Sequence, residues 1–227
     1  MLGANFRRGG ACVARGADAA DQREEIQAAF KGTPMSEIMQ VRRFEKPIGV
    51  DYLHQAMEAL GWCRKLYGVI PGIHFLAMDG RQSACIFDAP DAEAVRNVIR
   101  AGGRSEPEAV WPCTVHPGPD DDGASLPLER DSTGTLVIVE RLFDRPSRPD
   151  QLQADIALPP EPSGARYVRS YLSNDRLRAI SLYTAPDLEL VREAYRVAGV
   201  KFDRIWPAYA VDGTPAKAEL QPSEGCR

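Results

Sequence analysis

The sequence predicts an α+β fold built from two tandem copies of one unit, each with the element order βαββαβ. The first observation behind this prediction is an internal repeat. An Ala-Pro-Asp turn, a Val-Arg pair, a further Arg, a Gly and a Trp-Pro pair occur within residues 89–112 and return within residues 185–207. The offset is 96 residues up to the glycine and 95 at the Trp-Pro pair. The other two observations are the order of periodic segments in each half and a polar segment between the halves.

The first unit is predicted at residues 36–117. Apolar residues between Val50 and Leu60 are spaced by three and four residues, which is typical of the buried face of a helix. Asp79-Gly80 lies between two short apolar runs and is the strongest local signal for a β-hairpin. The elements expected are, in order, a strand at 38–44, a helix at 49–66, strands at 73–78 and 82–87, a helix at 91–102 and a strand at 109–115.

The second unit is predicted at residues 134–212, and both units then have the element order of the ferredoxin-like fold. Residues 118–133, which carry an Asp-Asp-Asp-Gly run, are expected to be an exposed linker. Residues 1–35 are expected to be a mobile leader and residues 213–227 a loose tail, because both lie outside the repeat. The elements expected in the second unit are a strand at 136–143, a short helix at 148–157, strands at 167–172 and 179–183, a helix at 188–197 and a strand at 202–211.

The helices of a ferredoxin-like unit cover only one face of its sheet, so the other face must be buried elsewhere. Two such units in one chain can bury their open faces against each other. We therefore expect the units to pack sheet to sheet as a pseudo-dimeric α/β barrel with a cavity between the sheets.

Composition narrows the class of protein. Apolar residues make up 44% and charged residues 26% of the chain, which is ordinary for a globular protein. The net charge of -4, with basic residues scattered among acidic ones, argues against nucleic acid as a partner. No stretch of 18 apolar residues is present, so no membrane association is expected. The five cysteines are an odd number without a Cys-x-x-Cys pair, which favours reduced thiols and a cytoplasmic location.

His74 and Cys85 are the first candidate site residues. A two-residue turn at Asp79-Gly80 sets His74 directly opposite Cys85, with both side chains on one face of the hairpin. The opposite face is apolar and is expected to pack on the helices, which would turn His74 and Cys85 toward the second unit. There they could be metal ligands or a nucleophile and its base. Both are more often found at a buried core position, where His is hydrogen-bonded and Cys behaves as a small hydrophobic residue. The apolar face consists of Ile73, Phe75, Ala84 and Ile86.

Other candidates are spread over both units. His116 follows the last strand of the first unit, and with Cys113 it has a Cys-x-x-His spacing that is a weak metal signal. In the second unit Ser170 and Ser181 occupy the positions of His74 and Cys85, which suits a lined cavity. Glu140-Arg141 lies in the first strand of this unit, so that one of the two side chains must face inward. Each Trp-Pro pair is expected to be structural, with the proline on an edge strand. The sequence has no glycine-rich phosphate loop, HExxH motif or nucleophile elbow, so no nucleotide cofactor is expected.

These segments resemble the domain-of-unknown-function 4242 family. The resemblance implies a ferredoxin-like fold, dimerisation through the sheets and nickel binding. Where members of that family often have a His before the Ser-Tyr of the second strand, this chain has Arg169 in the second unit and Ile73 in the first. The Glu of the first strand corresponds to Glu140 in the second unit and to Val41 in the first. The residues that carry the resemblance are Val139-Glu140-Arg141-Leu142-Phe143, Val168-Arg169-Ser170-Tyr171, Ser181-Leu182-Tyr183, Ala185-Pro186-Asp187, Val191-Arg192 and Ala198-Gly199, with Phe87, Ala89-Pro90-Asp91, Val95-Arg96 and Gly102-Gly103 in the first unit.

Two classes of function follow. The first is a small-ligand or transition-metal binding protein, with His74, Cys85 and His116 as ligands for nickel or zinc. The second is an enzyme of the dimeric α/β-barrel type, an oxygenase, isomerase or cyclase acting on a small organic substrate. Glu140, Arg169, Ser170 and Ser181 would then line the ligand cavity, with Glu140 and His74 in acid-base roles. The expected partners are a small molecule or a metal ion, and a second copy of the chain in a homodimer.

Overall fold

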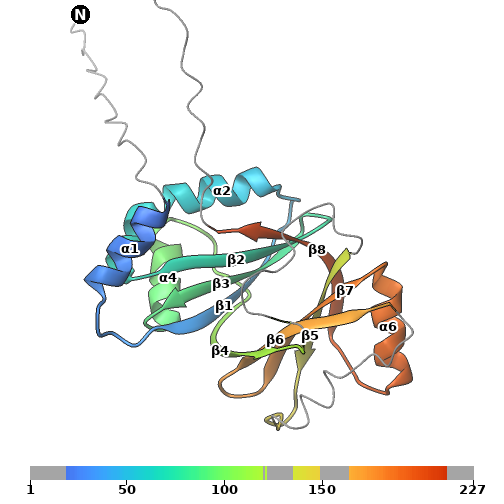
Figure 1. Ribbon diagram of the computed structural model, residues 1–227. Helices are drawn as coiled ribbons and strands as arrows, with labels where there is room; N and C mark the ends of the chain where they lie inside the picture. The colour runs from blue at the N-terminus through green and yellow to red at the C-terminus, as the bar shows by residue number, and fades with distance from the viewer. Residues whose placement is uncertain (1–18, 120, 122–134, 149–163, 214–227) are drawn as a thin grey trace, which may run out of the picture.

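The fold was analysed on a computed structural model that describes residues 19–119, 121, 135–148 and 164–213 (Figure 1). The class is α+β, as predicted, and all the strand pairings described are antiparallel. The elements in chain order are α1 (Ala19–Ala29), β1 (Ser36–Arg43), α2 (Val50–Ala59), α3 (Gly61–Tyr67), β2 (Ile70–Ala77), β3 (Gln82–Ala89), α4 (Ala92–Ala101), β4 (Ala109–Pro117), β5 (Thr135–Leu142), β6 (Arg166–Ser173), β7 (Arg178–Ala185), α6 (Leu188–Val197) and β8 (Arg204–Asp212).

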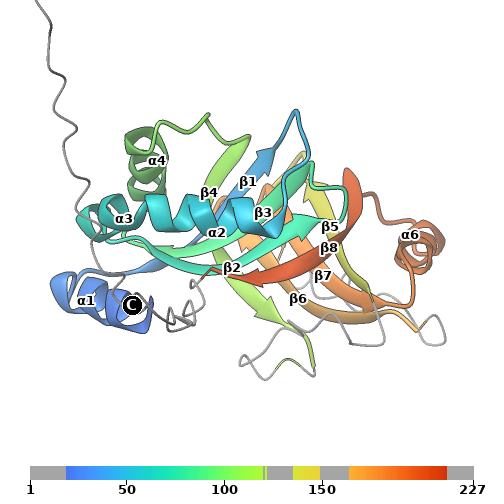
Figure 2. The ribbon, with the colours of Figure 1, turned by 90° about the horizontal axis from the view of Figure 1, so that it is seen from above.

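The eight strands close into one barrel in the order β1-β3-β2-β8-β5-β7-β6-β4. Within the first half the strand order is β4-β1-β3-β2, and within the second it is β8-β5-β7-β6. The halves are joined where β2 pairs with β8 and where β4 pairs with β6. Figure 2 shows α2, α3 and α4 outside the first half and α6 outside the second, with the barrel between them. The predicted short helix at 148–157 falls almost wholly on residues 149–163, outside the described residues.

The inside of the barrel is an apolar core rather than an open cavity. Phe75, Ala84 and Ile86 belong to this core and Ile73 packs against it, so the prediction that this face of the hairpin contacts the helices is wrong. The interior of an eight-stranded barrel is just wide enough to be filled by side chains. Because water is excluded there, the most apolar face of each strand points inward. The buried members of the core are Met39, Val41, Phe75, Ala77, Ala84, Ile86, Cys113, Leu136, Ile138, Tyr171, Ile180, Leu182, Trp206 and Ala208.

Local signals in the sequence explain the repeated elements. The carboxylate of Asp91 accepts a hydrogen bond from the backbone N–H of Ala94 at 2.8 Å and so caps the start of α4. Asp187 caps α6 in the same way, through the N–H of Leu190 at 3.1 Å. Gly80 adopts a φ of 68° in the turn between β2 and β3, a left-handed conformation that glycine reaches without strain.

Residues 19–29 form a docked helix and not part of a mobile leader. Ile26 of α1 is 2% exposed, and α1 packs against α3. Arg23 forms an ion pair with Asp88 at 3.0 Å, and Lys65 forms another with Glu25. The sequence does not predict this contact, because Ile26 is the one buried apolar side chain among residues 23–29.

The two strands that contain Trp-Pro pairs are not at an edge, since each pairs with two neighbours. β4 pairs with β1 over Ala109–Cys113 and with β6 over Cys113–Pro117. The proline at 112 therefore lies one residue before the ladder with β6 begins, and its carbonyl accepts a hydrogen bond from the backbone N–H of Asn174 at 3.0 Å. Pro207 has the same position in β8, which pairs with β5 up to Ala208 and with β2 from Ala208 onward. Each proline is thus accommodated as at an edge, although the strand is not one.

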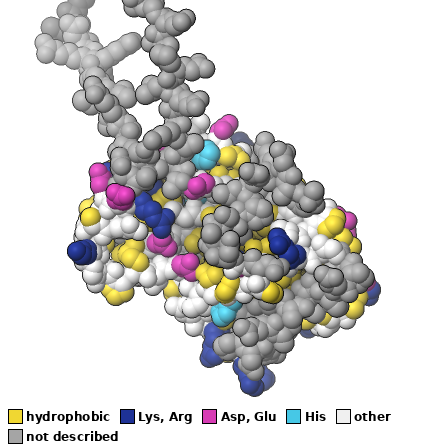
Figure 3. All heavy atoms as spheres, viewed as in Figure 1, with side chains coloured by type: hydrophobic (Ala, Val, Ile, Leu, Met, Phe, Trp, Pro, Cys, Tyr) yellow, Lys and Arg dark blue, Asp and Glu magenta, His cyan; other side chains and the backbone are white. Residues whose placement is uncertain are grey.

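The described helices include none that is long and apolar enough to cross a membrane. On the face seen in Figure 3, acidic and basic side chains are interspersed rather than gathered into a patch of one sign.

Candidate functional site

The predicted pairing of His74 with Cys85 is confirmed by the register of β2 and β3. The predicted direction of the two side chains is wrong. Cys85 belongs to the apolar cluster beneath α3 and α4, and the His74 ring lies 5.6 Å from the ring of Phe87 in the same cluster. The pair therefore faces the helices of its own half and not the second half. Both faces of the sheet are buried, so the alternation of polar and apolar residues along the strands did not indicate which face the His74 and Cys85 side chains share with the helices.

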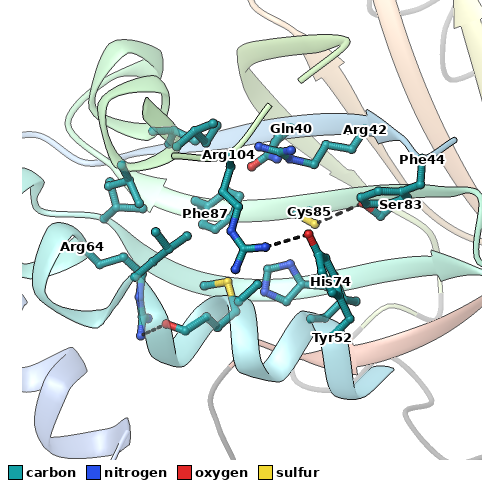
Figure 4. Close-up of a pocket in the computed structure, with 18 residues that line it drawn as sticks. Gln40, Arg42, Phe44, Tyr52, Arg64, His74, Ser83, Cys85, Phe87 and Arg104 are labelled. Carbon is teal, nitrogen blue, oxygen red and sulfur yellow. Dashed lines mark hydrogen bonds between the residues drawn. The ribbon is translucent and has the colours of Figure 1, made fainter. Parts of the chain in front are cut away.

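His74 and Cys85 lie in a pocket between the outer face of β1, β2 and β3 and the helices α2, α3 and α4, which we name the helix-sheet pocket (Figure 4). Its volume is about 70 Å³. This exceeds the roughly 10–15 Å³ that one water needs but is below the roughly 300–1,000 Å³ of a drug-sized pocket. The lining residues are Gln40, Arg42, Phe44, Tyr52, Leu53, Ala56, Met57, Leu60, Arg64, Val69, His74, Ser83, Cys85, Phe87, Val95, Val98, Ile99 and Arg104.

The imidazole of His74 is the most unusual polar group in this pocket. It is 2% exposed, and neither of its ring nitrogens has a hydrogen-bond partner within the described part of the chain. Burial, together with the nearby positive charge of Arg64, lowers the pKa of His74 to about 4. The ring is therefore neutral near pH 7, with one N–H donor and one acceptor nitrogen left for a ligand.

Cys85 is not set up as a nucleophile. Its Sγ lies 3.9 Å from the hydroxyl oxygen of Ser83, and burial raises the pKa of the thiol to about 12. The thiolate, rather than the thiol, attacks electrophiles and binds metals, so a protonated buried thiol is inert. Cys85 acts here as a small apolar wall of the pocket.

Arginines line the mouth of the pocket. Arg104 donates a hydrogen bond to the Tyr52 hydroxyl at 2.6 Å, and its guanidinium lies 5.2 Å from the centre of the Tyr52 ring (Figure 4). Burial lowers the pKa of Arg42, whose guanidinium donates to the Ser105 hydroxyl at 3.4 Å. The pocket lining contains three arginines and, among the residues the structure describes, no aspartate or glutamate. Its electrostatic character is that of an anion site with apolar walls.

The three predicted metal ligands do not come together. His116 lies on β4, and two strands, β3 and β1, separate β4 from the strand of His74. The register sets His74 level with Val110 of β4, and His116 lies six residues further along that strand, on the order of 20 Å away. Within residues 19–119, 121, 135–148 and 164–213, no group of three or more His, Cys, Asp or Glu side chains could hold a metal ion. The residues around His74 therefore do not fit a nickel or zinc site.

Among the predicted cavity residues, Glu140 faces the barrel interior and Arg141 does not. The carboxylate of Glu140 accepts a hydrogen bond from the indole N–H of Trp206 at 2.8 Å and an ion pair from Arg204 at 3.2 Å. Burial raises the pKa of Glu140, against the effect of the Trp206 bond. Glu140 lines a cavity of about 240 Å³ at one end of the barrel, which we name the barrel-mouth cavity.

The other predicted cavity residues lie elsewhere. Ser170 and Ser181 share a 2.6 Å hydrogen bond between their hydroxyl groups, on the face of β6 and β7 turned away from the barrel core. Arg169 forms an ion pair with Asp121 and lies opposite Pro117, at the end of β4 far from the Glu140 cavity. These residues therefore do not line one cavity together with Glu140.

Sequence reasoning missed the pocket residues contributed by β1, α2 and the segment after α4. Gln40, Tyr52 and Arg104 are far apart in the chain, and none of them belongs to a motif. A weak signal was available, because Gln40 is a polar residue within a strand of otherwise apolar character, Ile38–Val41. In the structure Gln40 is 5% exposed and lines the pocket.

The family model described as nickel responsive protein SCO4226-like matches residues 141–207, less than half of the chain. The matched segment contains no His and no Cys. No curated protein is similar enough to the chain to count as a match.

Solved structures of similar shape are distant in sequence. The candidate chlorite dismutase TA0507 has 14% identity and a TM-score of 0.41, covering 79% of this chain and 95% of that chain. A mutant chlorite dismutase from Candidatus Nitrospira defluvii in complex with cyanide has 11% identity and a TM-score of 0.42, covering 85% and 95%. A candidate monooxygenase from Lactobacillus acidophilus NCFM has 7% identity and a TM-score of 0.35, covering 79% and 95%.

Proposed function

We propose that this protein binds a small organic acid with an apolar body in the helix-sheet pocket. The observation that carries the proposal is the combination of apolar walls, arginines at the mouth, and the buried His74 ring, which has no hydrogen-bond partner among the described residues. A buried polar group without a partner costs about 1–3 kcal/mol, and a bound ligand would recover that cost.

The charge of the pocket favours an anion over a neutral ligand. Arg42 and Arg104 form no ion pair with a carboxylate in the described part of the chain, so their charges are available to a ligand at the mouth. The carboxylate of the ligand would contact these guanidinium groups, and its apolar body would lie among Leu53, Met57 and Phe87. The volume of the pocket limits the ligand to a small molecule.

Binding is supported better than catalysis. A nucleophilic mechanism needs a thiolate or an activating base, and the Cys85 thiol stays protonated. No carboxylate of the described residues is hydrogen-bonded to the His74 ring, whereas a general base of the His-Asp kind is oriented by such a bond. An enzyme of the dimeric α/β-barrel type remains the alternative, and turnover of a bound acid would establish it.

Calorimetric titration with hexanoate tests the proposal, with hexan-1-ol as the uncharged probe. We expect hexanoate to bind and hexan-1-ol to bind at least about tenfold more weakly, because a charge-assisted hydrogen bond contributes on the order of 1.5–3 kcal/mol. Arg104→Gln should weaken hexanoate binding by a similar factor. Ala56→Phe, which adds a ring inside the pocket, should abolish it.

Arg192→Gln is the matched control, because Arg192 is an exposed arginine on α6 whose ion pair with Glu189 lies within the helix. Its hexanoate affinity should equal that of the original protein. Equal affinities for hexanoate and hexan-1-ol, or an unchanged affinity in Arg104→Gln, would contradict the proposal.

The match to a nickel-responsive family is the observation that favours a metal function. Titration of the untagged protein with Ni²⁺ addresses it directly. Stoichiometric binding that is lost in both His74→Ala and Cys85→Ala would assign the site to a metal and overturn the organic-acid proposal.

We also infer that the halves arose by tandem duplication. The inference rests on the sequence repeat, the equivalent strand order of the two halves and the equivalent aspartate caps of α4 and α6. Within this scheme the chain corresponds to a dimer of single units fused into one barrel.

A further inference from the structure

The two tryptophans of the repeat face different surroundings inside the barrel. Trp206 lies in the core, and its indole N–H donates to the Glu140 carboxylate at 2.8 Å. Trp111 packs against the same core, and its indole nitrogen is buried without a hydrogen-bond partner in the segments that the structure describes. Buried Trp N–H groups usually find an acceptor, so this one requires an explanation.

The strand register shows why the acceptor is missing. Trp206 pairs with Ile138 on β5, and Glu140 is two residues further along that strand on the same face. Trp111 pairs with Met39 on β1, and the residue two positions further along is Val41. Val41 therefore stands near Trp111 where Glu140 stands near Trp206, and its isopropyl group cannot accept a hydrogen bond from the indole N–H.

Trp111 and Val41 both line the barrel-mouth cavity, whose volume is about 240 Å³. Arg178 lies over the Trp111 ring, with its guanidinium carbon 5.4 Å from the ring centre. The Arg178 guanidinium makes no hydrogen bond or ion pair with any side chain of the described residues. Arg204, on the same cavity, is already paired with Glu140 and Glu108, at 3.2 and 2.9 Å.

We propose that the barrel-mouth cavity is a binding site for a small carboxylate, which accepts hydrogen bonds from the Trp111 indole N–H and from Arg178. The hydrogen bond between Trp206 and Glu140 in the other half shows the geometry expected for this contact. The ligand would supply the carboxylate that Val41 lacks. The apolar part of the ligand would contact Val41, Ala109 and Ile180. This site is separate from the helix-sheet pocket, since it lies at one end of the barrel and the pocket lies between the outer face of the sheet and the helices.

The test follows the indole N–H signals in proton–nitrogen NMR spectra of the full chain during titration with propionate. The chain has three tryptophans, at 62, 111 and 206, and single Trp→Phe variants assign their signals. We expect the Trp111 signal to move saturably with propionate and not with propan-1-ol, while the Trp206 signal keeps its position. Arg178→Gln should weaken propionate binding by about tenfold, as expected for the loss of a charge-assisted hydrogen bond.

Two variants complete the test. Val41→Glu places a carboxylate where Glu140 stands in the other half, so the Trp111 signal should already be shifted without propionate and should no longer respond to it. Arg104→Gln alters only the helix-sheet pocket and should leave the propionate response of Trp111 unchanged. A Trp111 signal that does not respond to propionate in the original protein, or that responds equally to propan-1-ol, would overturn the proposal.

Discussion

Beneath α4 in the first half, Phe87 and Ile99 leave room for the helix-sheet pocket, whereas beneath α6 in the second half Tyr183 and Tyr195 occupy the corresponding positions. The two tyrosine hydroxyls are hydrogen-bonded at 2.9 Å, and their ring centres are 5.9 Å apart. Tyr167 and Phe202 extend the same aromatic cluster. On one strand arrangement, the helix above the sheet thus contributes the aliphatic Ile99 in the first half and the hydrogen-bonded Tyr195 ring in the second.

The largest expected difference between the halves concerns the aromatic cluster. Tyr195 is 1% exposed, and Tyr195→Ala should lower the free energy of unfolding by about 3–5 kcal/mol, because the cavity left by a large side chain cannot be refilled. Val197→Ala on the same helix is the control, since Val197 is 69% exposed and its replacement should change stability by less than about 0.5 kcal/mol. Urea denaturation measures both. A loss for Tyr195→Ala as small as that of the control would mean that the cluster does not support the second half.

The next effect depends on pH and belongs to the first half. The pKa of His74 is about 4 in the folded protein and 6.5 in an unfolded chain, so below pH 6.5 protons bind preferentially to the unfolded state. The stability contributed by neutral His74 is complete above pH 6.5 and is lost as the pH falls through about 4. The total loss is on the order of 3 kcal/mol.

Urea denaturation between pH 7 and pH 4 measures this dependence. His74→Leu should have a flatter profile than the original protein, because the burial that lowers the pKa no longer acts on a titrating group. Comparing the two proteins removes the contribution of carboxylates such as Glu37 and Glu140, whose pKa values are raised by burial. Parallel profiles would show that His74 is not buried as described.

A smaller effect should be equal in the two halves. Asp91→Ala and Asp187→Ala each remove a side-chain cap from the first turn of a helix and should each cost about 1 kcal/mol. Asp91→Asn and Asp187→Asn keep a capping oxygen and should cost less. Thermal or urea denaturation of the four variants compares the caps. A cost at one helix and none at the other would contradict the equivalence of α4 and α6.

The smallest effect concerns α1, the helix that precedes the first strand of the first half. The Arg23–Asp88 ion pair is partly exposed, with side chains 43% and 34% exposed, so Arg23→Gln should cost no more than about 1 kcal/mol. Ile26→Ala should destabilise the docking of α1 more, since Ile26 is buried. Hydrogen exchange of the α1 backbone is the measurement. Faster exchange in Arg23→Gln than in Ile26→Ala would contradict a docking based on apolar contact.

Much of the fold follows from local signals in the chain. The Asp79-Gly80 turn set the register of His74 against Cys85, and the repeated aspartates marked where α4 and α6 begin. The helix predicted at 49–66 is divided at Leu60 into α2 and α3. The α1 contact was missed, because one buried isoleucine in a polar segment does not form a pattern.

The direction of the hairpin faces was decided only by the tertiary structure. A turn fixes which side chains share a face, but an apolar face and a mixed face can each be buried when one lies inside a barrel and the other under helices. In the closed barrel, Phe75, Ala84 and Ile86 lie in the interior. His74 and Cys85 lie on the outer face of the sheet, beneath the helices of the first half. The same closure brought Trp111 and Arg178 to one cavity from opposite halves of the chain, because only β6 separates the strands that carry them, β4 and β7, in the closed barrel. The sequence by itself determined most of the strands, the caps of α4 and α6 and the register of the first hairpin, because those depend on contacts between near neighbours.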